Sequence, residues 1–168
     1  MSDVAEKEPW NMSVAERVEF AKQMKEIGRR YFLDGLVEDA MESYRSGLKR
    51  LIPAYDLPHD LLSEVNSLKL SFYLNIAACQ IKLGLPQHVV KNCSKALCID
   101  NRNIKAFYRR SVAWTEINEF EKAREDIKAG LLIDEKNKTF KVQLAKIDLK
   151  CKEQNMKYNG MLKKCLSG

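Results

Sequence analysis

Residues that interrupt helices are scarce in this sequence. Only 7 Gly and 4 Pro occur among 168 residues, which is too few for a sandwich of many short, tightly turned strands. Residues that favour helices, such as Ala, Leu, Lys, Glu, Met and Arg, dominate instead. A chain of this length is close to the usual size of one domain and is long enough for one hydrophobic core. The composition therefore predicts an all-helical domain.

Long apolar segments and disulfide patterns are missing too. No apolar run approaches the roughly 20 residues needed to cross a bilayer. The N-terminal MSDVAEKEPW has neither the basic nor the apolar region of a signal peptide. The five cysteines are odd in number and scattered, which favours reduced thiols. We therefore expect a cytoplasmic protein, with the nucleus as a further location, and no membrane segment in this chain.

Residue patterns that carry catalysis or metal binding are also lacking. The two histidines, His59 and His88, stand in no metal-spaced motif, and no cysteine set has the spacing of a zinc site. No glycine-rich GxGxxG or P-loop motif indicates a nucleotide site. We therefore predict a protein-binding chain with no catalytic residues, no metal, no cofactor and no small-molecule substrate.

Positive charge is concentrated near the C-terminus. The formal net charge is +6, and residues 135–168 account for all of it with nine Lys against three carboxylates. A basic tail can favour acidic partners or nucleic acid. A single lysine face without interleaved aromatic residues is weak support for nucleic-acid binding. We interpret the tail as a solvated helix face.

The sequence contains a threefold repeat. Windows that begin at residues 21, 70 and 104 share one chemical pattern, and the second and third lie 34 residues apart, the tetratricopeptide period. The first and second lie 49 apart, which is 34 plus a 15-residue insertion. Small residues recur at positions 8, 20 and 27 and large ones at positions 4, 11 and 24, with Gln80 and Cys93 as the weakest matches. This pattern predicts two antiparallel helices per repeat that approach closely.

The predicted fold is all-α, with three tetratricopeptide helix-turn-helix repeats in a right-handed solenoid and a C-terminal capping helix. Ser13 and Glu16 form a capping-box signature that opens the first helix, and Pro86 is suited to the first turn of another. The expected segments are an N-terminal segment 1–12, the repeats within 13–135 (about 21–54, 70–103 and 104–137) and the capping helix 137–166. The expected repeat helices are 13–33, 36–52, 59–83, 86–97, 103–117 and 119–132.

A second stripe runs along the first helix of each repeat. Positions 2, 5, 6 and 9 lie nearly opposite the face formed by positions 4, 8 and 11, so they line the concave groove of a stacked array. Five of these twelve residues are Lys or Arg and one is acidic, which favours an anionic ligand. The apolar members suit an acidic peptide that also carries apolar side chains. The stripe comprises Lys22, Lys25, Glu26, Arg29, Ser71, Leu74, Asn75, Ala78, Lys105, Tyr108, Arg109 and Val112.

Several segments carry a family resemblance. The stretches EPWNMS, YLNIAACQIKL, KAFYRR and KYNGMLKKCL resemble the tetratricopeptide (TPR) domain of the large FKBP-type immunophilins and their aryl-hydrocarbon-receptor-interacting relatives. The resemblance covers nearly the whole chain. It implies a non-catalytic co-chaperone module, taken from a parent protein that carries a peptidyl-prolyl isomerase domain.

The resemblance also implies a carboxylate clamp for the EEVD-type C-terminus of heat-shock protein 90 or of the seventy-kilodalton chaperone. Lys25, Asn75, Lys105 and Arg109 match clamp residues of that family, and Arg29 stands where asparagine is usual. A guanidinium only donates hydrogen bonds, so Arg29 either holds the carboxylate bidentately or obstructs the pocket. We expect Lys22, Leu74, Ala78 and Tyr108 to line the same peptide site. The alternative is a chaperone-independent scaffold or dimerisation domain.

Overall fold

The computed structural model describes residues 11–51 and 58–166. Most of the expected N-terminal segment 1–12 and the loop around Pro53 lie outside these described residues. Within them the chain forms seven α-helices and no strand, which confirms the all-α prediction. Their bounds are α1 Val14–Leu33, α2 Val37–Leu51, α3 His59–Lys82, α4 Pro86–Ile99, α5 Ile104–Glu116, α6 Phe120–Ile133 and α7 Lys138–Leu166.

Local sequence signals explain where the first helices begin. The Ser13 hydroxyl oxygen accepts a hydrogen bond from the Glu16 amide at 3.2 Å, and the Glu16 carboxylate accepts one from the Ser13 amide at 2.7 Å. This reciprocal pair satisfies two amides that the helix itself leaves unpaired. Pro86 occupies the first turn of α4, where its missing N–H costs nothing.

The turn inside each repeat uses the same backbone geometry. Gly35, Gly84 and Asn118 all have positive φ (80°, 65° and 63°) and stand at position 15 of their repeats. In each case the next residue donates its amide hydrogen bond to the carbonyl four residues before the turn residue, at 2.9 Å. Glycine adopts this left-handed conformation without strain, and asparagine tolerates it better than most residues. Asn118 therefore takes, in the third repeat, the place that glycine has in the first two.

Two of the turns between repeats also share one hydrogen-bond pattern. Asp100 ends α4 and accepts a hydrogen bond from the Asn103 side chain at 2.9 Å, and Asp134 ends α6 and accepts one from Asn137 at 3.0 Å. The two asparagine side chains then accept hydrogen bonds from backbone amides in the first turns of α5 and α7. These turns are 34 residues apart, so α7 begins as the first helix of a fourth repeat.

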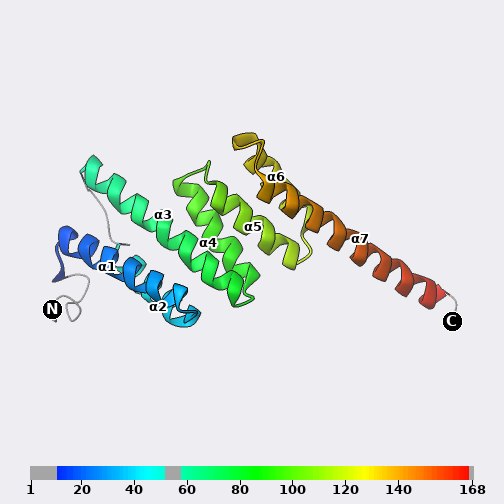
Figure 1. Ribbon diagram of the computed structural model, residues 1–168, viewed down its shortest axis with the longest axis horizontal. Coiled ribbons are helices and arrows are strands. Elements are labelled where there is room, and N and C mark those ends of the chain that lie inside the picture. The colour runs from blue at the N-terminus through cyan, green and yellow to red at the C-terminus, as the bar shows by residue number, and fades with distance from the viewer. Residues whose placement is uncertain (1–10, 52–57, 167–168) are drawn as a thin grey trace.

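The helices stack in order as a solenoid. The pairs α1–α2, α3–α4 and α5–α6 form hairpins, each packed on the next (Figure 1). Three hydrophobic clusters follow one another along the stack. They are centred on Phe72 between α1, α2 and α3, on Cys93 between α3, α4 and α5, and on Ile127 and Phe140 between α6 and α7. Each repeat therefore contacts mainly its neighbours, as in other solenoids.

Small residues at the predicted close contacts are buried against aromatic rings. A Cβ added to Gly28 would lie 2.5 Å from the Tyr44 ring, and one added to Gly47 would lie 2.5 Å from the Phe72 ring. Phe140 covers Gly130 in the same way. All three glycines stand inside helices with ordinary backbone angles, so glycine is not needed there for its conformational freedom. It is needed because a larger side chain would clash with the neighbouring aromatic ring.

Gly47 gives a direct test of this close approach. We expect Gly47→Ala to lower the free energy of unfolding by about 2 kcal/mol, because overpacking against the fully buried Phe72 exceeds the gain in helix propensity. Gly160→Ala is the control, since nothing lies within 4 Å of its added Cβ on α7, and it should not destabilise the fold. Urea unfolding followed by circular dichroism measures both. Equal effects of the two substitutions would contradict the steric explanation.

Two position-11 side chains depart from the expected core pattern. Tyr31 is 37% exposed, so it does not fill a gap between helices as the repeat pattern predicted. Gln80 is 2% exposed, although it is polar. Its Oε1 accepts a hydrogen bond from the Asn92 side chain of α4 at 2.9 Å. That bond makes burial of the amide tolerable and joins the two helices of the second repeat.

A buried ion pair joins the two helices of the third repeat, and its arginine also bonds to the second repeat. Arg110 of α5 donates to both carboxylate oxygens of Asp126 on α6, at 2.9 and 2.6 Å, and to the Ser94 hydroxyl of α4 at 2.9 Å. The Asp126 side chain is 5% exposed and that of Arg110 is 22% exposed. A bidentate geometry with a third hydrogen bond satisfies most of the donors of Arg110.

Helix α7 caps the solenoid only along its first half. Phe140, Gln143 and Ile147 are buried against α5 and α6, and Cys151 is half-buried. Every residue from Lys152 to Leu166 is exposed. Figure 1 shows this second half continuing away from the stacked helices. The capping role expected of 137–166 therefore belongs to residues 138–151.

Candidate functional site: a cationic groove

The first helices of the three repeats bring the expected clamp residues to neighbouring elements. Lys25 lies on α1, Asn75 on α3, and Lys105 and Arg109 lie one turn apart on α5. Lys25 and Asn75 are half-exposed and Lys105 is exposed. Among the described residues, no carboxylate pairs with Lys25 or Lys105. These two ammonium groups can therefore bind an external anion without first breaking an internal ion pair.

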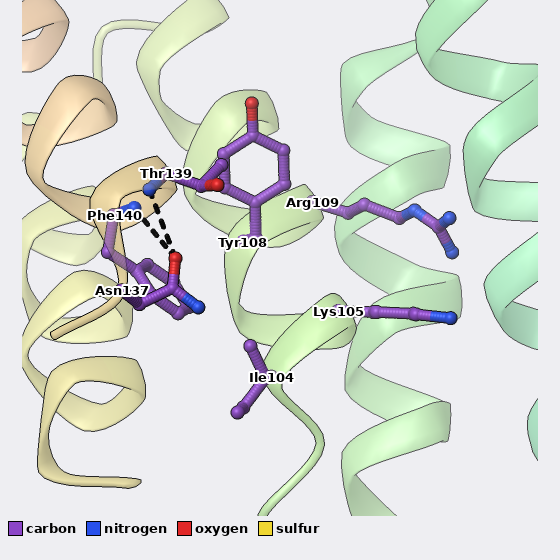
Figure 2. Close-up of a pocket in the computed structure, with 7 residues that line it drawn as sticks. All are labelled: Ile104, Lys105, Tyr108, Arg109, Asn137, Thr139 and Phe140. Carbon is purple, nitrogen blue, oxygen red and sulfur yellow. Dashed lines mark hydrogen bonds between the residues drawn. The ribbon is translucent and has the colours of Figure 1, made fainter. Parts of the chain in front are cut away.

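Arg109 is held in place by the preceding repeat. Its Nη1 donates a hydrogen bond at 2.8 Å to the carbonyl oxygen of Leu74 on α3. Figure 2 shows Arg109 and Lys105 extending from α5 in the same direction, away from Phe140 and Asn137. Burial lowers the pKa of Arg109 from its ordinary value, but a guanidinium remains charged at physiological pH. The bond to α3 fixes the position of this cation before any ligand arrives.

The two other cations of the stripe already have carboxylate partners. Arg29 donates to Glu26 through Nε and Nη2, with the shortest distance 2.8 Å. Lys22 pairs with Glu64 of α3 at 2.7 Å. Glu64 belongs to the 15-residue insertion, so the repeat pattern could not place it beside Lys22. The free positive charge of the groove is therefore concentrated on Lys25, Lys105 and Arg109.

The expected apolar residues occupy different environments. Leu74 is only 8% exposed and packs in the core of the second repeat, where its carbonyl holds Arg109. Ala78 and Tyr108 are half-exposed. Tyr108 meets the edge of the Phe140 ring, with centroids 6.2 Å apart. Aromatic surface next to the free cations therefore comes from Tyr108.

A hollow of about 270 Å³ opens beside the two cations of α5. Figure 2 shows its lining, which sequence reasoning identified only in part. Asn137 is fixed there, because its Oδ1 accepts hydrogen bonds from the amides of Thr139 and Phe140 at 3.0 and 3.4 Å. The hollow can accept an apolar side chain next to a carboxylate bound by the cations. Its lining residues are Ile104, Lys105, Tyr108, Arg109, Asn137, Thr139 and Phe140.

The described residues offer little for other chemistry. Burial raises the pKa of the Cys79 thiol to about 11 and that of Cys93 to about 12, so neither forms a thiolate at neutral pH. No group of three or more metal-ligating side chains occurs within residues 11–51 and 58–166. In the same ranges, none of the helices has an apolar stretch long enough to span a membrane.

The sequence of the chain is similar to that of known proteins. No protein-family model matches the chain. It is 34% identical over 139 residues to the mouse peptidyl-prolyl cis-trans isomerase FKBP4, an alignment that covers 83% of the chain and 30% of FKBP4. The chain therefore corresponds to less than a third of that relative's length.

Solved structures with a similar fold include a domain of an FK506-binding protein and a co-chaperone. The C-terminal TPR-containing domain of a Plasmodium falciparum FK506-binding protein matches with a TM-score of 0.82 and 25% identity, over 89% of this chain and 99% of that domain. The Hsp90 co-chaperone Cns1 from Saccharomyces cerevisiae matches with a TM-score of 0.75 and 29% identity, over 97% of this chain and 46% of Cns1. The repeats, their turns and these relatives together show that the chain is a tetratricopeptide domain of the type found in the large FKBP-type immunophilins.

Proposed function

We propose that the groove binds the acidic C-terminal peptide of heat-shock protein 90, or of the seventy-kilodalton chaperone, and that the chain is a non-catalytic co-chaperone module of the cytoplasm. One observation carries the proposal. Lys25, Asn75 and Lys105 come from three successive first helices, and neither lysine has a carboxylate partner among the described residues. The structural neighbour Cns1, an Hsp90 co-chaperone, supports the same partner class.

The binding mechanism is electrostatic and geometric. A C-terminal aspartate presents two carboxylates, one on its side chain and one at the chain end. Lys25, Asn75 and Lys105 would donate hydrogen bonds to them, and Arg109 would use its remaining donors for an upstream acidic group. Each charge-assisted hydrogen bond contributes about 1.5–3 kcal/mol net. A few such bonds, less the cost of ordering the peptide, give an affinity of roughly micromolar order.

The role of Arg29 follows from its partner. The guanidinium is bound to Glu26 on its own helix and is largely exposed. In this arrangement it neither fills the clamp nor adds a free charge to it. We therefore assign the carboxylates of the C-terminal aspartate to Lys25, Asn75 and Lys105 and the upstream acidic group to Arg109, with Arg29 at the rim of the site.

The test is a titration that isolates the terminal carboxylate. A fluorescent MEEVD peptide with a free C-terminal acid should bind with a Kd of roughly micromolar order, measured by anisotropy. The same peptide with a C-terminal amide should bind at least about tenfold more weakly, because it lacks one of the two clamped charges. Equal binding of acid and amide would rule out the clamp.

A second candidate is self-association or scaffolding without a chaperone. The exposed half of α7 favours it, because large apolar side chains lie open there: Met156, Tyr158, Met161, Leu162 and Leu166. Exposed apolar surface of this kind marks interaction sites in many proteins. This candidate predicts a sedimentation coefficient that rises with protein concentration and no discrimination between the acid and amide peptides.

A further inference from the structure

The wall of the groove continues beyond the third repeat onto α7. Because α7 begins 34 residues after α5, its Val142 and Lys146 correspond to Tyr108 and Val112, which are groove positions of the third repeat. Val142 is 56% exposed and Lys146 is exposed as well. Gln143, which corresponds to Arg109, is buried instead, so the capping helix continues the stripe through Thr139, Val142 and Lys146, which are exposed.

A second hollow, of about 360 Å³, lies between α5 and α7 along this continuation. We call it the α5–α7 furrow. It shares Tyr108 with the first hollow, so the two are neighbours on one surface. Its lining also includes Val112, Glu116, Lys146, Leu149, Lys150 and Glu153.

The furrow combines an apolar floor with one available cation. Leu149 is 59% exposed and faces the same hollow as Val112 and Tyr108. Lys150 is paired with Glu116 at 2.7 Å. Lys146 has no carboxylate partner among the described residues. This chemistry fits a short extended segment with one apolar and one acidic side chain.

The position of the clamp determines which part of a ligand reaches the furrow. If Lys25, Asn75 and Lys105 hold the C-terminal carboxylate, the ligand chain ends between α1, α3 and α5. Only residues that precede the C-terminus can then reach α7. Adjacent helix axes lie about 10 Å apart and an extended chain advances about 3.3 Å per residue. About three residues therefore carry the peptide from α5 to α7.

The opposite direction, across α1, is less suited to an acidic peptide. There Lys22 is neutralised by Glu64 and Arg29 by Glu26. On that side the two stripe cations outside the clamp are therefore already paired. The furrow on the α7 side also contains two carboxylates, Glu116 and Glu153, but it offers Lys146, which has no carboxylate partner in the part of the chain that the structure describes.

We propose that the α5–α7 furrow binds the segment that precedes the last five residues of the acidic ligand, with an apolar side chain on Leu149 and Val112 and a carboxylate on Lys146. This inference rests on the proposed function, because it takes the clamped C-terminus as its starting point. It makes α7 a determinant of which acidic termini the domain prefers.

Peptides that share one C-terminus test the furrow separately from the clamp. The probes are MEEVD, the longer GDGLGMEEVD, and GNGSGMEEVD, in which the upstream leucine and aspartate are replaced by serine and asparagine. We expect the leucine-aspartate peptide to bind about tenfold more tightly than the serine-asparagine peptide, as anisotropy competition would show. Leu149→Asn and Lys146→Glu should each bring this ratio close to one. Lys141→Glu, the same charge change at an exposed position of α7 outside the furrow, should leave the ratio unchanged.

The outcomes separate the two proposals. If MEEVD binds as a free acid but the two longer peptides bind equally, the clamp stands and the furrow is overturned. If MEEVD does not bind, the proposed function fails and the furrow proposal fails with it. A tenfold ratio that survives Leu149→Asn and Lys146→Glu would place the upstream contacts elsewhere and also overturn the furrow.

Discussion

We expect a Lys105→Glu variant to bind the free-acid MEEVD peptide at least about 100-fold more weakly than the unaltered domain, because the change replaces an attraction with a repulsion at the clamped carboxylate. Lys105 is exposed and has no carboxylate partner among the described residues, so the substitution breaks no internal contact that the fold needs. Its neighbour Arg109 lies one turn away and is anchored to α3. Fluorescence anisotropy measures the loss.

The control for this variant is Lys128→Glu. Lys128 is exposed on α6, the second helix of its repeat, and lines neither hollow. The two substitutions change the net charge equally, so they separate local binding from the general field of a basic protein. If both weaken the peptide to the same extent, the ligand is attracted non-specifically and has no defined clamp.

We expect Asp126→Ala to lower the free energy of unfolding by about 3 kcal/mol, because it leaves the half-buried guanidinium of Arg110 without its bidentate partner. Thermal and urea unfolding measure the change. As a surface comparison, Glu116→Ala removes the exposed Lys150 pair, and this should cost at most about 1 kcal/mol. The difference tests whether burial determines the value of an ion pair in this fold.

A paired substitution identifies the cause of the Asp126 effect. The double variant Arg110→Met with Asp126→Leu removes both charges and keeps apolar volume, so it should recover most of the stability that Asp126→Ala loses. If the double variant is as unstable as the single one, the loss comes from packing at α4, α5 and α6. The unpaired charge would then not be its source.

The sequence predicted the helices well because their ends are set by local chemistry. Ser13 with Glu16, Gly35, Gly84 and Pro86 each fix a helix end through their own backbone or side-chain bonds. The left-handed turn at Asn118 was harder to predict, because asparagine takes the left-handed conformation less often than glycine. The exposure of Tyr31 and the burial of Gln80 depend on which neighbouring helix is present, and a repeat pattern does not contain that information.

The sequence predicts which helix carries each candidate site residue, but not the contacts that these residues make between helices. Helical spacing placed Lys25, Lys105 and Arg109 on one stripe, because that spacing is a property of each helix alone. It could not show that Arg109 would donate to Leu74 or that Glu64 would neutralise Lys22. Those contacts join different helices across the stack. The linings of the two hollows between α5 and α7 were predicted only in part for the same reason.

The paired Asp–Asn turns affect which substitutions such a domain can accept during evolution. Asp100 with Asn103 and Asp134 with Asn137 close the α4–α5 and α6–α7 turns through short local hydrogen bonds, and these bonds do not involve the groove cations Lys25 and Lys105. Such groove residues can then be exchanged one at a time without breaking the turns between repeats. One architecture of this kind can diversify its ligands while its frame stays constant.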